Sequence, residues 1–403
     1  MTSEITRERL QEVLTECGWN KTKAGEILGL HRDTVRKYIR EYQLQPQEGT
    51  LEAALSLEPE EHRTKLENRI LKRRIEELLE ERSKDDAIYD LFLTASERSL
   101  EPPQWLAPQT KGKGERAIAT ALLSDCHFDE VVNPAEFNWR NQYNRDIAER
   151  RLKNYFKNVL RLSRDYINGI KMEQLVLPLL GDMLSGNIHE ELRQTNEFPI
   201  LDSLLHWSER VASGIEMLLD VFSDIYVPCV VGNHGRLDRK PRFKFRAKEN
   251  FDWILYHIVA KHFRDVKEVT FAIPESADFS YSVYNTRYLL THGDQFRGGS
   301  GIAGILTPVF IGDHRKTRRS VALSDPYDHM LVGHFHQQRD MGSVIINGSL
   351  KGYDEFAFIN NYPYEPPRQA FWLTDPQHGK SGISAAIHVI DKNEEWQAER
   401  KAG

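Results

Sequence analysis

Cysteine is scarce in this sequence of 403 residues. Cys17, Cys126 and Cys229 lie far apart and form no CxxC pair, which argues against a disulfide framework or a zinc knuckle and favours a reducing cytoplasm. No apolar run approaches the length needed to cross a membrane, so we expect no membrane partner. The first ten residues are polar and charged, and this pattern predicts no secretory signal.

The chain also lacks a strong excess of either charge. It carries 54 lysines and arginines against 60 acidic residues, a formal net charge of -6. This balance argues against an overall basic coat for nucleic acid, although it permits a local basic face. The length suffices for two or three domains, and changes in texture predict boundaries at 1–46, 47–116 and 117–390, with a polar tail at 391–403.

The first region, residues 1–46, has the pattern of a small all-α domain. Helices are predicted over 22–28 and 32–42, with Gly29 at the turn between them. The apolar spine that would pack these helices consists of Ala24, Ile27, Leu28, Leu30, Val35 and Ile39.

This segment resembles the helix-turn-helix of Fis-like regulators and transposase-type DNA-binding modules. The resemblance implies a DNA partner, contacted by side chains on the second helix: Arg32, Thr34, Arg36 and Lys37. One departure from the pattern is Gly25, at a helix position usually held by alanine, which costs about 1 kcal/mol of helix propensity. The alternative for the same shape is a small helical bundle that contacts another protein.

The second region, residues 47–116, is dense in Glu, Lys, Arg and Leu before it reaches a linker. Leu71, Ile75 and Leu78 fall on one helical stripe. The stripe predicts either a coiled coil that forms a homodimer through residues 60–84 or a solvated helical spacer. Four helix-breaking residues then indicate the linker: Pro102, Pro103, Pro108 and Gly112.

In the third region, residues 117–390, short apolar runs alternate with amphipathic helices. The runs are AIATALLSD, QLVLPLLGD, IYVPCVVGN, TRYLLTHGD, DHMLVGH and GSVIINGS. They are rich in Val, Ile and Leu and are ended by Gly, Asp, Asn or Ser, as buried strands are. One of the helices, FDWILYHIVAKHF at 251–263, repeats its apolar residues at helical spacing. The alternation predicts a layered α/β domain.

Five of these runs end in residues that can bind a metal ion, namely Asp125, His127, Asp182, Asn233, His234, His292, His334 and His336. Because open α/β sheets bind ligands at the carboxyl ends of their strands, we expect these side chains to converge. Mixed nitrogen and oxygen donors suit two borderline divalent ions, manganese first and then iron, zinc or nickel, better than calcium or magnesium. A single Asp or His at a strand end is more often a structural cap, but five such ends in succession favour a metal site.

The motifs D-x-H, GD, GNH, HGD and GH-x-H, in this order, resemble the calcineurin-like metallophosphoesterase superfamily over about residues 117–350. The resemblance implies a four-layer sandwich of two mixed β-sheets flanked by helices. It also implies one metal held by Asp125, His127 and His336, a second held by Asn233, His292 and His334, and Asp182 as the bridge between them.

The same resemblance implies a mechanism in which a hydroxide activated by both metals attacks phosphorus in line. His234 would assist the leaving oxygen as a donor or general acid, so Asp182 and His234 are the expected catalytic residues. Two departures from the family pattern are visible. Gly235 follows GNH where family members often carry an acid, and GDMLSG lacks the second acid of phosphoprotein phosphatases.

A basic stretch, LDRKPRFKFRAKEN, follows directly after GNHGR. If extended, it would place its cations on one face and Phe243 and Phe245 on the other. Such a strip suits a polyanionic backbone and predicts a substrate rim of Arg236, Lys240, Arg242, Lys244 and Arg246. The alternative is a solvated edge whose phenylalanines belong to the core. HRKTRRS at 314–320 forms a second basic cluster.

Together these patterns predict an enzyme, a metal-dependent phosphodiesterase that acts on DNA. The DNA-binding head resembles that of phage-encoded members of the superfamily, so we expect a phage-type nuclease in the cytoplasm of a bacterial host. Two alternatives stay open. One is a phosphatase or cyclic-nucleotide phosphodiesterase recruited to DNA, and the other is a non-catalytic DNA-binding adaptor that retains the fold.

Overall fold

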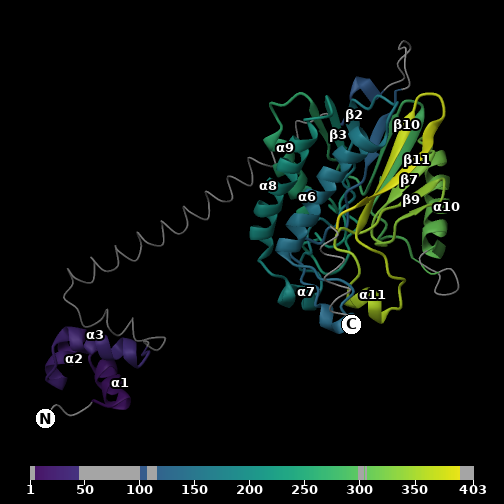
Figure 1. Cartoon of the computed structure of the whole chain (residues 1–403). Helices are drawn as coiled ribbons and strands as arrows, with labels where there is room; N and C mark the ends of the chain where they lie inside the picture. Colours follow the sequence, from purple (N-terminus) through teal and green to yellow (C-terminus); the bar gives the residue numbers. More distant parts are fainter. Residues whose placement is uncertain (1–4, 45–99, 107–115, 298–303, 305, 391–403) are drawn as a thin grey trace. The chain divides into compact units, whose positions relative to one another are not determined.

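The computed structural model describes residues 5–44, 100–106, 116–297, 304 and 306–390 (Figure 1). The chain divides into two compact units, Met1–Phe92 and Leu93–Gly403. Three predicted features lie outside the described residues: the dimerisation helix at 60–84, Pro108 and Gly112 of the linker, and the polar tail at 391–403.

Three short helices form the described part of the first unit: α1 (Arg7–Glu16), α2 (Lys21–Leu28) and α3 (Arg32–Glu41). Asn20 caps α2 because its side-chain oxygen accepts hydrogen bonds from the backbone nitrogens of Thr22 and Lys23, at 3.1 and 3.2 Å. Gly29 ends α2 in the left-handed conformation, with φ of 64°. The predicted helix, glycine turn and helix are therefore confirmed.

The core of the first unit holds six buried side chains, namely Leu10, Val13, Leu14, Ala24, Val35 and Leu44. The prediction that Ile27 belongs to this core is wrong, because Ile27 is 55% exposed. It precedes Leu28, which packs on the core, and so lies about 100° away around the helix. Gly25 has a steric reason to be glycine, since a Cβ there would lie 2.5 Å from the carbonyl oxygen of Leu30.

Eleven strands are described in the second unit. They are β1 (Ile118–Ala121), β2 (Gln174–Val176), β3 (Asp224–Pro228), β4 (Val269–Ala272), β5 (Asp278–Val283), β6 (Thr286–Thr291), β7 (His329–Val332), β8 (Arg339–Asp340), β9 (Val344–Ile346), β10 (Arg368–Asp375) and β11 (Gly379–His388). A six-stranded sheet has the order β11-β10-β1-β2-β3-β4, and a five-stranded sheet has the order β5-β6-β7-β9-β8.

Both sheets are mixed. In the six-stranded sheet β1 to β4 are parallel, while β10 pairs antiparallel with β1 and with β11. In the five-stranded sheet β6, β7 and β9 are parallel, and β5 and β8 are antiparallel edge strands. The carboxyl ends of the parallel strands therefore meet at one edge of each sheet.

Helices cover the outer faces of the sheets (Figure 1). Three of them lie beside β2 and β3, namely α6 (Arg145–Arg161), α8 (Ile200–Leu218) and α9 (Phe251–His262), and α10 (Leu306–Ala322) lies beside β7 and β9. Short helices are α7 (Glu190–Thr195), α11 (Glu355–Ile359), η1 (Gln104–Leu106), η2 (Pro134–Phe137) and η3 (Leu162–Tyr166). Within the described part of the chain, no helix combines the length and apolar character that a membrane crossing needs.

Apolar side chains from both sheets fill the space between them. Val176 and Tyr226 of one sheet share a buried cluster with Leu290 of the other, and a second cluster joins Val309 of α10 to Met330 of the five-stranded sheet. The order helix, sheet, sheet, helix confirms the predicted four-layer α/β sandwich.

All six predicted strands are present, as β1, β2, β3, β6, β7 and β9, and the helix predicted over 251–263 is α9. The sequence pattern does not predict β4, β5, β8, β10 or β11. The edge strand β11 has a physical reason to escape detection, because most of its side chains are half-buried or exposed and its run GKSGISAAIH is weakly apolar.

Candidate metal centre

The eight residues predicted at the metal site all lie in loops that follow parallel strands. Asp125 and His127 follow β1, Asp182 follows β2, and Asn233 and His234 follow β3. His292 follows β6, and His334 and His336 follow β7. The site therefore draws on both sheets.

Five of these residues have left-handed backbone conformations, which residues with a Cβ rarely adopt. They are Asp125, His127, Asp182, His334 and His336, with φ between 47° and 66°. Such conformations cost free energy and collect at functional sites, where the surrounding structure holds them in place. The backbone conformations therefore indicate a functional site at these five residues, independently of the sequence motifs.

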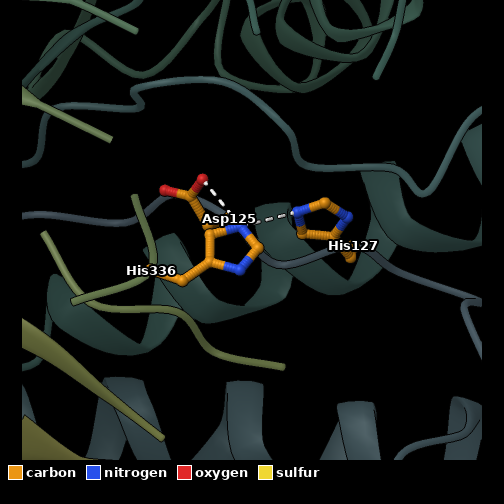
Figure 2. Close-up of side chains that lie close together, drawn as sticks. All are labelled: Asp125, His127 and His336. Carbon is orange, nitrogen blue, oxygen red and sulfur yellow. Dashed lines mark hydrogen bonds and ion pairs between the residues drawn. The ribbon is translucent and has the colours of Figure 1, made fainter. Parts of the chain in front are cut away.

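Asp125, His127 and His336 form the first group of donor atoms (Figure 2). Nε2 of His336 lies 3.1 Å from Nε2 of His127 and 3.4 Å from Oδ1 of Asp125. Two imidazole nitrogens and a carboxylate oxygen that face one another in this way share a common target, as the ligands of a metal ion do.

Asp182, His292 and His334 form the second group, and all their donor atoms lie within 4.8 Å of one another. Nε2 of His292 lies 2.9 Å from Oδ2 of Asp182 and 3.2 Å from Oδ1 of Asn233. A third group joins Asp182 to His127 and His234, so Asp182 connects both halves of the centre.

The second ring nitrogens of three histidines show that the centre fits cations. Nδ1 of His292 lies 2.7 Å from the carbonyl oxygen of Leu180, and Nδ1 of His127 lies 3.1 Å from Oε2 of Glu130. Nδ1 of His234 lies 2.9 Å from the carbonyl oxygen of Ser185. Because the carbonyl oxygens of Leu180 and Ser185 only accept hydrogen bonds, Nδ1 of His292 and of His234 carries a proton, and Nε2 is the nitrogen available to the centre.

The electrostatic field of the centre favours positive charge. Burial alone would lower the pKa of His292, but the adjacent carboxylate of Asp182 raises it to about 10. Burial together with Lys351 and His234 lowers the pKa of His127 to about 3, so this ring stays neutral. The buried carboxylates thus favour a cation beside them, which a divalent ion at Nε2 of His292 can supply in place of the proton, while His127 offers a neutral imidazole.

Asp252 supports the loops that carry the predicted ligands. Its carboxylate accepts hydrogen bonds from the backbone nitrogens of Asp182, Met183 and Gly232, at 2.9, 3.1 and 2.9 Å. Burial, with a further contribution from Asp182, raises the pKa of Asp252 to about 6. Sequence reasoning missed Asp252, although a lone acid near the start of an apolar helix was a signal that could have identified it.

A buried ion-pair network backs the first group of ligands. Nζ of Lys351 lies 2.7 Å from Oε1 of Glu130 and 2.6 Å from Oδ2 of Asp354. Although burial opposes its charge, Lys351 holds the pKa of Glu130 well below its usual value. Glu130 therefore stays ionised and places a negative charge 3.1 Å from Nδ1 of His127. Sequence reasoning missed this network.

The structure explains why glycine follows His234. A Cβ at Gly235 would lie 2.2 Å from Oδ1 of Asn250, so no acid fits at this position. The ring of His234 instead faces the carbonyl oxygen of Ser185, and its backbone nitrogen donates to Oδ1 of Asp182 at 2.7 Å. His189, another residue that the motifs do not reveal, lies beside it with ring centroids 5.4 Å apart.

The predicted rim residues belong to residues 236–249, named here the basic loop. The expectation of an extended strip is wrong, because residues 246–249 form a turn. The alternative that Phe243 and Phe245 are core residues is also wrong, because their exposed fractions are 104% and 67%. Phe243 and Phe245 themselves lie in bends, at residues 243–245.

The cations of the basic loop differ in their contacts. Arg246 lies 2.6 Å from Oδ1 of Asp294, and Arg242 forms ion pairs with Asp238 and Glu249 at 2.6 and 2.9 Å. Three further cations of the predicted rim have no ion pair with an acid in the described part of the chain, namely Arg236, Lys240 and Lys244. Burial lowers the pKa of Arg236, which stands two residues after His234 in the sequence.

The second basic cluster lies on α10, where two of its cations have a structural partner. Lys316 and Arg319 contact the carboxylate of Asp278 on β5, at 2.6 and 2.5 Å. These contacts fasten α10 to the five-stranded sheet.

The predicted DNA-contact residues lie on α3. Arg32, Arg36 and Lys37 are exposed and Thr34 is half-buried. Arg36 lies 3.3 Å from Asp33 one turn earlier, an exposed contact that binding to a phosphate can replace.

Comparison with known proteins supports the first unit. Residues 3–42 match a family model described as bacterial regulatory protein, Fis family. Together with α1, α2 and α3, this match confirms the predicted helix-turn-helix. No curated protein sequence matches the chain.

Several solved structures resemble the chain. Vacuolar protein sorting 29 from Cryptosporidium parvum is 13% identical, and the match covers 67% of this chain and 97% of that chain with a TM-score of 0.27. A predicted phosphoesterase from Streptococcus pneumoniae is 12% identical, over 66% and 95% of the chains, with a TM-score of 0.25. Sulfate thiohydrolase SoxB from Thermus thermophilus is 9% identical, over 73% and 60%, with a TM-score of 0.29. Sequence identities and TM-scores this low carry no conclusion about the function of this chain.

Proposed function

We propose that the second unit is a phosphodiesterase that uses two divalent metal ions and acts on DNA. The observation that carries this proposal is the pair of donor groups described above, which draw on both sheets and share Asp182 as a neighbour. A histidine or carboxylate with a structural role usually contacts one partner, whereas the side chains of these donor groups converge on a common centre.

The residues that would hold the two ions are Asp125, His127, Asp182, Asn233, His292, His334 and His336. When bound there, two divalent ions would lower the pKa of a water molecule toward about 7 and neutralise the charge of a phosphate. Manganese is our preferred assignment, because the donor set mixes imidazole nitrogen with carboxylate and amide oxygen.

We assign His234 the role of a proton donor, although its ring also lies within reach of His127 and Asp182. Its Nδ1 faces the carbonyl oxygen of Ser185 at 2.9 Å, so Nε2 is the nitrogen left to face a substrate. A protonated ring in this orientation can donate to the oxygen that leaves phosphorus. Arg236, two residues after His234, would supply a guanidinium for the phosphate oxygens.

Two features favour DNA as the substrate. The Fis-family match over residues 3–42 supports a DNA-binding head. The basic loop begins directly after the GNHG motif and carries seven cations and two acids, so it places positive charge next to the proposed centre. A small phosphomonoester would need neither feature.

Full-length protein with manganese, magnesium or a chelator tests the proposal. We expect hydrolysis of bis-p-nitrophenyl phosphate and of labelled DNA in manganese, and none in the chelator. Faster hydrolysis of the monoester p-nitrophenyl phosphate, with DNA left intact, would favour a phosphatase instead. Binding of DNA without hydrolysis of any ester would identify a non-catalytic adaptor.

A further inference from the structure

The basic loop displays two aromatic rings that the fold does not use. Phe243 is fully exposed and Phe245 is 67% exposed, whereas seven phenylalanines of the second unit are buried, namely Phe128, Phe137, Phe156, Phe222, Phe263, Phe271 and Phe371. An aromatic side chain gains stability by burying roughly 150–250 Å² of surface, and these two rings forgo most of that gain. Their place beside the proposed centre therefore needs another explanation.

The loop that carries these rings is anchored at several points. Arg236 pairs with Asn250 in a β-bridge, and the backbone nitrogen of Leu237 donates to the carbonyl oxygen of Glu249 at 3.2 Å. Arg246 is tied to Asp294 at 2.6 Å, and Ala247 is buried. The rings are thus presented from a defined position near the centre.

Positive charge surrounds Phe245, and Phe243 stands between Arg242 and Lys244 in the sequence. A shallow groove in the loop is lined by Phe245 together with Arg236, Lys240, Arg242, Lys244 and Arg246, besides two acids that pair with Arg242. A protein partner that buried the rings would also have to desolvate these cations, whereas a nucleic acid offers phosphates for the cations and flat bases for the rings.

From this arrangement we infer that Phe243 and Phe245 stack on unpaired bases of a single DNA strand, next to the phosphate that is cut. The inference rests on the proposed function and specifies its substrate as single-stranded. In a duplex the faces of the bases are covered by their neighbours, so only an unpaired strand offers bases to the rings without the cost of unstacking.

The experiment compares single-stranded and duplex DNA of one sequence as substrates of the full-length protein in manganese. Its variants are Phe243→Ala, Phe243→Trp and, as a matched control, Phe356→Ala on α11, where the ring is 65% exposed. A base stacked on an aromatic ring contributes enough binding that its loss should lower kcat/KM for the single strand by about 5- to 150-fold in Phe243→Ala. Phe243→Trp should retain the activity, and Phe356→Ala should match the wild type.

Two further measurements separate this inference from the proposed function. All variants should hydrolyse bis-p-nitrophenyl phosphate equally, because this ester carries no neighbouring base that could stack on Phe243. A single strand with 2-aminopurine, bound in chelator, should change its fluorescence with the wild type and not with Phe243→Ala. If no ester is hydrolysed, the proposed function fails and this fluorescence still decides the stacking. Equal behaviour of Phe243→Ala and Phe356→Ala on the single strand, or a loss confined to duplex DNA, would overturn the inference.

Discussion

Oδ2 of Asp182 lies 2.9 Å from Nε2 of His292, although the two residues follow strands of different sheets. Asp182 comes after β2 in the six-stranded sheet, and His292 comes directly after β6 in the five-stranded sheet. The contact therefore exists only when the sheets pack face to face. It makes the proposed metal centre dependent on the core between the sheets.

Asp182→Asn should abolish hydrolysis because it removes the carboxylate that lies near His127 of the first donor group and belongs to the second. We expect phosphodiester hydrolysis to fall by more than about 100-fold, since even residues behind metal ligands commonly contribute 10- to 100-fold. The fold should persist, because an asparagine oxygen can still accept from the backbone nitrogen of His234. Activity and bound metal per chain are the measurements, with circular dichroism as the control. Full activity in this variant would exclude Asp182 as a bridge.

The predicted ligands could be found from sequence because their signal is local. Each lies within a few residues of a buried strand, and the carboxyl ends of parallel strands meet at one edge of a sheet. The pattern therefore predicts that Asp125, Asp182 and His292 lie close together. The fold class follows from the same alternation of strands and helices.

The supporting residues could not be found because their signal is not local. Lys351 and Glu130 are 221 positions apart, and nothing in the sequence near either one announces the 2.7 Å contact. Similarly, the exposure of Phe243 depends on a turn and on anchors such as Arg246–Asp294, whereas an alternating pattern predicts an extended strip. The spacing of apolar residues predicts the helices and strands. The residues that support a metal ligand are set by tertiary contacts, which this spacing does not reveal.

Glu130→Gln should weaken metal binding without removing a ligand. The carboxylate of Glu130 places a negative charge 3.1 Å from Nδ1 of His127, whereas the amide of glutamine is neutral and can turn its NH₂ group toward the ring. Metal affinity measured by calorimetry should fall by about 10- to 100-fold. Glu136→Gln, at an exposed glutamate of η2, is the matched control and should bind metal as the wild type does. Equal affinity in both variants would show that Glu130 serves only the ion pair with Lys351.

Replacing Arg32, Arg36 and Lys37 with alanine should weaken duplex binding and flatten its dependence on salt. If each contacts one phosphate, the slope of log affinity against log salt should fall by about 2 to 3 in the triple variant. Fluorescence anisotropy of full-length protein at several salt concentrations measures this slope. Arg9→Ala on α1 is the control, since its guanidinium already pairs with Glu12 at 2.7 Å. An unchanged slope would mean that the head contacts protein instead.

The link between α10 and β5 should make stability depend on pH. Burial opposes the charge of Asp278, but Lys316 and Arg319 outweigh it and lower its pKa. A carboxyl group whose pKa is lower in the folded chain than in the unfolded chain stabilises the fold at pH values above its unfolded pKa, near 4. This contribution is lost as the pH falls through the pKa of the folded chain. Asp278→Asn should therefore cost about 3 kcal/mol at pH 7, where it leaves a buried lysine without its partner, and progressively less below about pH 5.

Melting curves of the wild type and Asp278→Asn between pH 7 and pH 3 measure this difference. Asp325→Asn is the control, because Asp325 pairs with Arg287 at a position about 40% exposed and should matter little at any pH. A gap between wild type and Asp278→Asn that stays constant down to pH 3 would contradict the assignment.

His234→Ala should separate proton donation from metal binding. Its ring faces Ser185 through Nδ1, so loss of the ring leaves the proposed ligands in place, and two metal ions per chain should remain. A deoxyribose alkoxide is a poor leaving group, so DNA hydrolysis should fall by about 10²- to 10⁴-fold. Hydrolysis of bis-p-nitrophenyl phosphate should fall clearly less, because p-nitrophenolate leaves with little help from a proton. Equal losses on both substrates would indicate that His234 positions the phosphate, and loss of metal would make it a ligand.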